Sequence, residues 1–204
     1  MIVLLSPGHG GIGPFETYLT RGKRSPHVPP GVYEGGFNEN MTGVIRAGLV
    51  NELGYNHVVN LRPGPVNTPL KSRIKYVNAL AKTLPDQDLV YAACHANAAR
   101  GKGWRPARGH RVFYKAWSPE SKKMASLIDT ELCKAWPNMP SRGIKAAPFL
   151  KECRGPKMPS VLIEFGFMTN ELDCEYLSDH NLIIDGAAAV TRALLGFAEW
   201  RAAR

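Results

Sequence analysis

Residues 1–11 read Met-Ile-Val-Leu-Leu-Ser-Pro-Gly-His-Gly-Gly. The four residues Ile2 to Leu5 form a short, continuous apolar run, which is typical of a buried strand in a parallel sheet. His9 follows at the end of this strand, between glycines. Ligands of open α/β sheets bind beyond the carboxyl ends of the strands, so a histidine there is placed to reach a metal ion or a substrate.

The glycines of the same stretch also match a dinucleotide-binding fingerprint, because residues 8–13 read G-x-G-x-x-G after a strand. That motif requires a helix that begins inside the glycines, with its N-terminus at the pyrophosphate. Pro14 follows instead, and residues 13–32 show no helical pattern. The sequence therefore disfavours a dinucleotide site.

Two further strand-like runs end in polar side chains of the same kind. Residues 88–94 are followed by His95, and residues 160–163 are followed by Glu164. The carboxyl ends of parallel strands lie at one edge of a sheet. We therefore expect His9, His95 and Glu164 to converge although they are far apart in the sequence.

A catalytic zinc site commonly uses two histidines and a carboxylate, with a further carboxylate as general base. The predicted third ligand is Glu34, which directly precedes a helical pattern over residues 37–53. Glu39 is the alternative, and an acidic residue near a helix N-terminus is ordinarily a surface group that favours the helix dipole. Glu164 is the predicted general base.

Strand-like and helix-like segments alternate along the chain. The expected strands cover 2–5, 57–61, 88–94, 110–114 and 160–164, and the expected helices cover 37–53, 70–83, 119–134 and 181–200. This alternation predicts an α/β fold, a three-layer α/β/α sandwich with a mostly parallel central sheet of about six strands. With 204 residues, of which 44% are hydrophobic and 21% charged, the chain fits one domain over residues 1–204.

The ordered set of motifs resembles the zinc-dependent N-acetylmuramoyl-L-alanine amidases of the amidase-3 type, which hydrolyse peptidoglycan. The likeness runs nearly from end to end and includes residues 7–11, Glu34, Arg62, 70–78, 95–98, 142–145 and 159–170. In that family the positions matching His9, Glu34 and His95 bind one Zn²⁺ per chain, and the position matching Glu164 is the catalytic carboxylate. Ser6 stands where the family commonly has Asp, and this change is expected to alter a hydrogen bond that orients His9. Cys94 is a second departure, at a position that holds no metal.

The resemblance implies hydrolysis of the amide between N-acetylmuramic acid and the L-alanine of the stem peptide. No linker or low-complexity segment separates the Glu164 strand from the final helix, so no separate cell-wall-binding domain is expected. Asn97 and Arg73 are the expected substrate-binding residues. Two alternatives stay open: a zinc peptidase that acts within the stem peptide, and a non-catalytic peptidoglycan-binding module. The module is disfavoured because all four site residues are present.

The chain carries a net charge of +9, which is concentrated in two loops. The basic residues concerned are Arg21, Lys23 and Arg24 in the first loop and Arg100, Lys102, Arg105 and Arg108 in the second. No nucleic-acid recognition motif accompanies them, so we expect attraction to anionic wall polymers or lipopolysaccharide rather than to nucleic acid. Loops that are charged only for solubility are the alternative.

The apolar run at the N-terminus is too short for a signal peptide and lacks a basic region, and no transmembrane segment is expected. We therefore expect an enzyme made in a host cytoplasm and released to the wall by another route, as a phage endolysin is. The helix at 181–200 is expected to dock on the domain, with contact to a membrane surface as the alternative.

The remaining cysteines and histidines show no ligand spacing. Free thiols are expected, with Cys94 and Cys133 inside apolar elements and a bridge between Cys153 and Cys174 left open. The other histidines are interpreted as surface or loop residues: His27, His57, His110 and His180.

Overall fold

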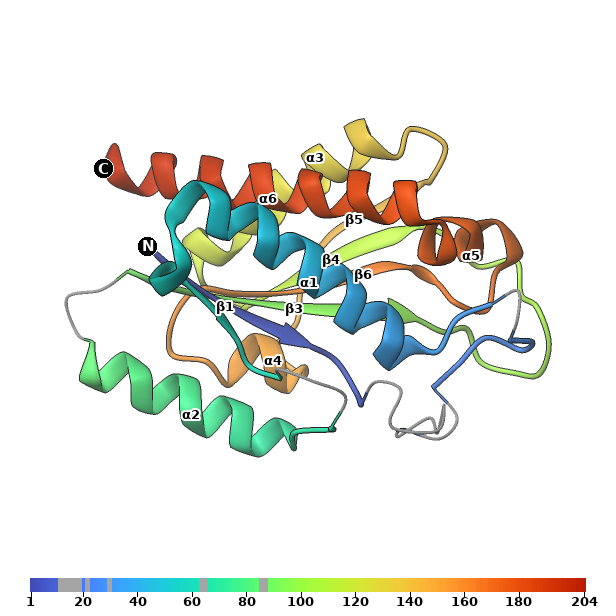
Figure 1. Cartoon of the computed structure of the whole chain (residues 1–204), viewed down its shortest axis with the longest axis horizontal. Coiled ribbons are helices and arrows are strands. Elements are labelled where there is room, and N and C mark those ends of the chain that lie inside the picture. Colours follow the sequence, from blue (N-terminus) through green and yellow to red (C-terminus); the bar gives the residue numbers. More distant parts are fainter. Residues whose placement is uncertain (11–19, 21–22, 29–30, 63–65, 85–87) are drawn as a thin grey trace.

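The computed structural model describes residues 1–10, 20, 23–28, 31–62, 66–84 and 88–204 (Figure 1). Within these residues six strands form one sheet in the order β2-β1-β3-β6-β4-β5. The strands are β1 (Ile2–Pro7), β2 (Val58–Asn60), β3 (Leu89–Asn97), β4 (His110–Tyr114), β5 (Ser141–Ala146) and β6 (Ser160–Phe167). Every pairing is parallel except that of β4 with β6, so the predicted mostly parallel sheet of about six strands is confirmed.

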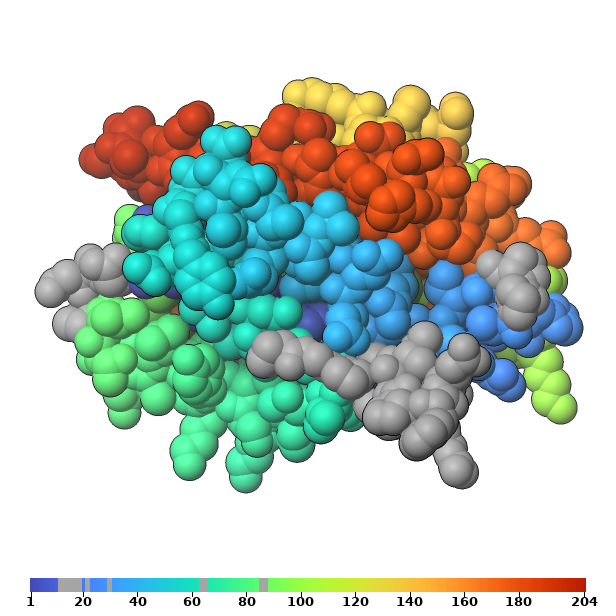
Figure 2. Space-filling view, viewed as in Figure 1, coloured from blue at the N-terminus to red at the C-terminus, as the bar shows by residue number. Residues whose placement is uncertain are grey.

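Helices cover both faces of the sheet, which confirms the predicted three-layer α/β fold (Figure 1). They are α1 (Glu34–Leu53), α2 (Leu70–Thr83), α3 (Pro119–Ala135), α4 (Lys151–Arg154), α5 (Glu171–Ser178) and α6 (His180–Ala202), with a 3-10 turn η2 (Tyr55–His57) before β2. Helices α1, α3 and α6 share one core with the sheet, and α2 and α4 cover the other face. Figure 2 shows α1 and α6 lying side by side over the first of these faces.

Apolar residues at helical spacing decide where α1 lies. Phe37, Met41, Ile45 and Leu49 recur every fourth position and are all buried against the sheet and α6. The helix begins at Glu34 rather than at 37, so Glu34 lies in its first turn. The stripe thus fixes the rotation of the helix and points Glu34 at the carboxyl edge of β1 and β3.

The strands that carry the candidate site are longer than predicted. β3 continues to Asn97 and β6 to Phe167, because the two strands stay paired beyond their apolar runs, with His95 opposite Glu164. β5, α4 and α5 were not predicted at all. β5 is half-exposed and reads Ser-Arg-Gly-Ile-Lys-Ala, and α4 has only four residues, so neither shows an apolar period.

Two predictions about single residues are wrong. His110 is fully buried in β4, not a surface or loop residue, because it lies on the strand face that packs on α3. Cys133 is exposed on α3 rather than within an apolar surface. All four cysteines are free, so Cys153 and Cys174 are not bridged.

Helix α6 docks on the domain as expected. Val190, Leu194 and Phe197 are buried in contact with the main core. α6 is also the one helix of the described residues whose length and composition would suffice to cross a membrane, and half of its most apolar window is buried inside the protein. This burial is what a core helix of a domain requires.

Candidate metal centre and active site

The turn after β1 brings the two histidines together. The Gly8 N–H donates to the Cys94 carbonyl (2.9 Å), which places Gly8 against β3. A Cβ atom at Gly8 would lie 2.2 Å from Cε1 of His95, so only glycine allows the His95 ring to approach. His9 has a positive φ of 58°, and its ring meets that of His95 edge-on at 5.3 Å.

Glu34 lies between the two rings. Its Oε1 is 3.3 Å from His9 Nε2 and 3.1 Å from His95 Nδ1, and one ligand atom from each of the three residues lies within 4.8 Å of the others. The second carboxylate oxygen, Oε2, is buried with no hydrogen-bond partner among the described residues. Burial raises the pKa of Glu34, but the hydrogen bonds to His9 and His95 outweigh it and lower the pKa to about 2.

This donor set fits a metal ion. Two imidazoles and an ionised carboxylate, one oxygen of which has no hydrogen-bond partner among the described residues, are the usual protein ligands of a catalytic zinc site. The alternative ligand Glu39 pairs instead with Arg62 at 3.2 Å. The structure thus brings together His9, Glu34 and His95, and their role as ligands stays a prediction.

Glu152 of α4 is a site residue that the sequence analysis missed. Its Oε2 accepts a hydrogen bond from His95 Nε2 at 2.9 Å, and its Oε1 accepts from Tyr91 Oη at 2.8 Å. Burial raises the pKa of Glu152, but His95 and Arg73 outweigh it and lower the pKa to about 2. An ionised carboxylate only accepts hydrogen bonds, so Nε2 carries a proton that it donates to Glu152, and the Nδ1 atom is turned toward Glu34.

The carboxylates of Glu152 and Glu34 also favour the protonated, positively charged form of His95 in the metal-free chain. Burial lowers the pKa of His95, but Glu152 and Glu34 outweigh it and raise the pKa to about 10. A metal ion at Nδ1 would therefore take the place of a proton at that atom.

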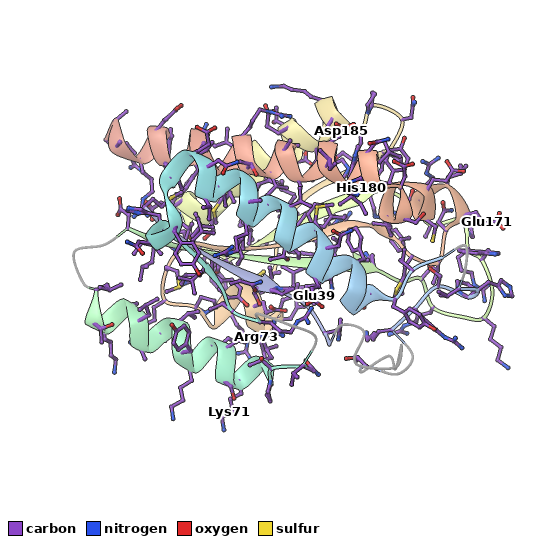
Figure 3. The ribbon with its side chains drawn as sticks, viewed as in Figure 1. Glu39, Lys71, Arg73, Glu171, His180 and Asp185 are labelled. Atoms are coloured by element: carbon purple, nitrogen blue, oxygen red, sulfur yellow. The ribbon has the colours of Figure 1, made fainter. Side chains whose placement is uncertain are left out.

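Ser6 and Arg73 support Glu152. The Ser6 hydroxyl donates to Glu152 Oε1 at 3.1 Å, and Arg73 Nη1 donates to Ser6 Oγ at 2.5 Å and to the Pro7 carbonyl at 3.0 Å. Ser6 therefore acts on the partner of His95, which corrects the expected effect on His9. Figure 3 shows Arg73 reaching from α2 toward the sheet, where it is buried. A contact between Arg73 and substrate stays a prediction.

Glu164 faces this cluster from β6. Its Cα is paired with that of His95, and its Oε2 is buried with no partner in the described part of the chain. Burial raises the pKa of Glu164 to about 7, with the charges of Glu34 and Glu152 adding to this effect and His95 opposing it. Such a carboxyl group is suited to accept and return a proton near neutral pH.

Asn97 lies two residues beyond His95, half-buried, and its Oδ1 accepts from the Ala98 N–H at 2.8 Å. Its predicted contact with substrate is not tested by this geometry. A hollow of about 450 Å³ opens beside this strand end, lined by residues that include Arg24, His27, Lys102 and Thr169. Basic side chains thus border the neighbourhood of the site.

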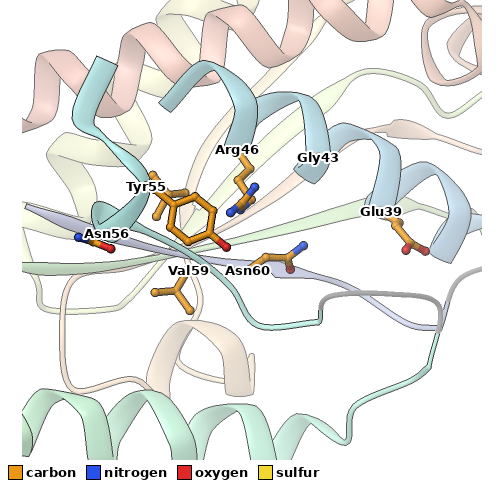
Figure 4. Close-up of a pocket in the computed structure, with 8 residues that line it drawn as sticks. Glu39, Gly43, Arg46, Tyr55, Asn56, Val59 and Asn60 are labelled. Carbon is orange, nitrogen blue, oxygen red and sulfur yellow. The ribbon is translucent and has the colours of Figure 1, made fainter. Parts of the chain in front are cut away.

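A larger hollow, of about 690 Å³, lies between α1 and the segment formed by η2 and β2 (Figure 4). Arg46, Tyr55 and Asn60 line it, and the Arg46 guanidinium lies 4.8 Å from the centre of the Tyr55 ring. Glu39 forms one end of this hollow and none of the clustered residues lines it. This hollow is therefore not the place where the candidate ligands meet.

An α/β sandwich with a His-Glu-His cluster and a buried carboxyl group at the carboxyl edge of its sheet is the arrangement of a metal-dependent hydrolase. The chain belongs to the Amidase_3 family, N-acetylmuramoyl-L-alanine amidase, whose model matches residues 3–195.

Several solved structures share the fold at low sequence identity. The N-acetylmuramoyl-L-alanine amidase of Clostridium difficile 630 is 22% identical, with 97% of this chain and 96% of that chain covered and a TM-score of 0.80. The catalytic domain of CwlV from Bacillus (Paenibacillus) polymyxa var. colistinus is 21% identical, with 97% and 98% covered and a TM-score of 0.74. The catalytic domain of the CD27L endolysin targeting Clostridia difficile is 21% identical, with 96% and 97% covered and a TM-score of 0.69. No curated protein matches the chain in sequence.

Proposed function

We propose that the protein is a zinc-dependent amidase that hydrolyses the amide between N-acetylmuramic acid and the L-alanine of the stem peptide in peptidoglycan. Membership of the amidase family supports the reaction. The observation that carries the zinc dependence is the meeting of His9, Glu34 and His95 within 4.8 Å at the sheet edge, with Glu164 on the neighbouring strand.

In this mechanism His9 Nε2, a Glu34 oxygen and His95 Nδ1 would hold the ion. When bound, zinc supplies a Lewis acid that polarises a carbonyl group and makes water more acidic. Glu152 holds the His95 ring in orientation through Nε2. Glu164 takes a proton from the attacking water and returns it to the alanine amine, which is a poor leaving group without that proton. Asn97 is the proposed hydrogen-bond partner of the substrate.

The exposed basic residues supply long-range attraction to the wall in this proposal. Lys23, Arg24, Arg100 and Lys102 are exposed, whereas Arg108 is half-buried and pairs with Asp173 at 3.2 Å. Arg21 lies outside the described residues. We propose anionic wall polymers or lipopolysaccharide as the partners of the exposed set, and no nucleic acid.

We also propose a role as a phage endolysin, made in the host cytoplasm and acting on the wall after release. The likeness in fold to an endolysin catalytic domain supports it.

Digestion of purified peptidoglycan tests the reaction. The amidase releases stem peptides with a free N-terminal L-alanine and creates no new glycan reducing ends. Glu164→Gln keeps its metal and fold but loses activity by about 10² to 10⁴, the usual contribution of one general acid-base group. New amino termini inside the stem would instead identify a peptidase, and wall binding without any cleavage would identify a binding module.

Metal analysis of a matched pair tests the zinc ligands. Glu34→Gln is expected to lose bound zinc, and Glu39→Gln is expected to keep it, because Glu39 pairs with Arg62. The reverse result would assign the ligand to Glu39.

A salt series tests the basic loops. Replacing Lys23, Arg24, Arg100 and Lys102 by glutamine should weaken binding to intact walls mainly at low salt, because exposed charges are screened beyond about 8 Å at physiological ionic strength. Cleavage of a small soluble muropeptide should change much less. An equal loss on both substrates would mean that these residues shape the catalytic groove.

A further inference from the structure

A second cluster of ligand-type side chains lies on β4 and α3. His110 is at the start of β4, and Asp129 and Cys133 are one helical turn apart on α3, so they face the same way. Asp129 Oδ1 lies 3.1 Å and Cys133 Sγ 3.9 Å from the same atom, His110 Nε2. One ligand atom from each residue lies within 4.8 Å of the others.

The way these groups converge distinguishes a cation site from a catalytic relay. In a nucleophile-histidine-acid relay the nucleophile and the acid approach different ring nitrogens. Here the thiol and the carboxylate both approach Nε2, while Nδ1 is buried and has no partner among the residues described. The thiol and the carboxylate therefore both lie beside the same nitrogen, with the three ligand atoms within 4.8 Å of one another.

The spacing suits a tetrahedral ion. With Zn–N near 2.1 Å and Zn–S near 2.3 Å, ligand atoms around tetrahedral zinc are separated by about 3.5 Å. The two separations from Nε2, 3.1 Å to Asp129 Oδ1 and 3.9 Å to Cys133 Sγ, lie on either side of that value. His110 is fully buried while Cys133 is exposed, so the cluster has a closed inner side and an outer side that an ion can enter.

The charges of the cluster also match a dication. A carboxylate and a thiolate together carry two negative charges, which a divalent ion neutralises. Ser141 Oγ donates to Asp129 Oδ1 at 2.6 Å and holds the carboxylate in place.

We propose that His110, Asp129 and Cys133 form a second metal site, for a borderline-soft divalent ion such as Zn²⁺. The site joins β4 to α3 on the face of the sheet opposite to α4. It does not depend on the proposed amidase reaction, because it shares no residue with the cluster of His9, Glu34 and His95.

Cobalt titration of the reduced, chelator-stripped full chain separates the two sites, because only this one contains a thiolate. We expect two Co²⁺ equivalents per chain, one of which produces thiolate-to-cobalt charge-transfer absorption. Cys133→Ser should lose this absorption and one equivalent. His9→Asn, chosen because Asn tolerates the positive φ at that position, should keep the absorption.

Saturating Co²⁺ without thiolate absorption in the unmodified chain, or absorption that persists in Cys133→Ser, would overturn the proposal.

Alkylation of the unmodified chain gives a second readout that needs no variant. Cys133 is the exposed thiol and the other three are buried. Bound Zn²⁺ should slow its alkylation at least about tenfold, because the metal occupies the sulfur lone pair that attacks the reagent. Equal rates with and without Zn²⁺ would count against the site.

Discussion

In the candidate active site, Gly8 leaves no room for a side chain beside the ring of His95. Gly8 is fixed by its own N–H bond to β3, and the ring is held from its far side by Glu152. Neither partner can move without breaking one of these bonds. The ring position is therefore determined by the backbone of one strand and the carboxylate of a short helix.

Gly8→Ala tests this packing. The added Cβ would lie 2.2 Å from the His95 ring, so we expect loss of most metal binding and activity. The matched control is Gly43→Ala on α1, where a Cβ meets nothing within 4 Å. That control should keep metal and activity and gain up to about 1 kcal/mol in unfolding free energy, because alanine is the better helix former. Metal content and urea unfolding of both variants decide the matter, and unchanged metal content in Gly8→Ala would contradict the argument.

Glu152→Gln tests the orientation of His95. The substitution keeps the shape but removes the charge that holds Nε2–H, and such changes around a metal ligand typically weaken metal binding by about 10- to 100-fold. Competition with a chelator measures the zinc dissociation constant. Glu39→Gln, which alters a carboxylate of α1 outside the cluster, is the control. Equal affinities for both variants would show that Glu152 only packs.

The sequence could predict His95 and Glu164 because each directly follows an apolar run, and His9 because it stands in the glycine-rich turn just after one. Glu152 could not be predicted in this way. It lies in the charged stretch Lys151-Glu152-Cys153-Arg154, which resembles a solvated surface segment. Only the fold shows that this carboxylate is buried beneath His95.

Among the elements, α6 links the other two helices of the main core, because it packs on both α1 and α3. Its buried and exposed faces can be compared directly on one helix. Leu194 is fully buried, whereas Ile184 is 40% exposed. Replacing one of these side chains at a time by alanine therefore tests how tightly α6 packs on the core.

Leu194→Ala should lower the unfolding free energy by about 2 to 5 kcal/mol, the cost of a buried leucine and the cavity that it leaves. Ile184→Ala should cost clearly less than Leu194→Ala, about 1 kcal/mol, because Ile184 is 40% exposed and less of its surface is buried by folding. Denaturant unfolding of both variants measures the difference. Similar small effects for both would mean that α6 is loosely docked and available to another surface.

Element boundaries were predictable where the apolar period continues to the end of the element. α2 spans Leu70–Thr83 as expected, and β4 spans His110–Tyr114. β3 and β6 extend beyond their apolar runs because pairing between strands, which no local pattern records, continues through polar residues. β5 is an exposed edge strand, so its sequence lacks a buried face that would reveal it.

At the scale of the whole molecule, buried thiols couple stability to alkaline pH. Burial and the neighbouring Glu152 charge raise the pKa of Cys153 from 9.0 to about 12. Because the folded-state pKa lies above the unfolded value, the folded state keeps its proton while the unfolded state loses it. The contribution of the Cys153 thiol to the free energy of unfolding is therefore complete below pH 9 and is lost as the pH rises toward 12.

Urea unfolding across this pH window tests the coupling. The thiol alone should reduce the unfolding free energy by up to about 1.4 kcal/mol per pH unit between the two pKa values. Cys153→Ala should show a shallower decline than the unmodified chain, whatever its stability at neutral pH. Cys133→Ala, at the exposed thiol, should keep nearly the whole decline. Parallel curves for all three proteins would contradict the prediction.

The strand order has a consequence for how the molecule is made. β6 is the last strand in the chain, yet it lies between β3 and β4 in the sheet. A nascent chain leaving the ribosome can pair β1, β2 and β3, and separately β4 with β5, but the two halves stay apart until residues 160–167 have emerged. Glu164 arrives on that same strand, so a growing chain acquires its proposed proton-transfer group only in the step that joins the sheet.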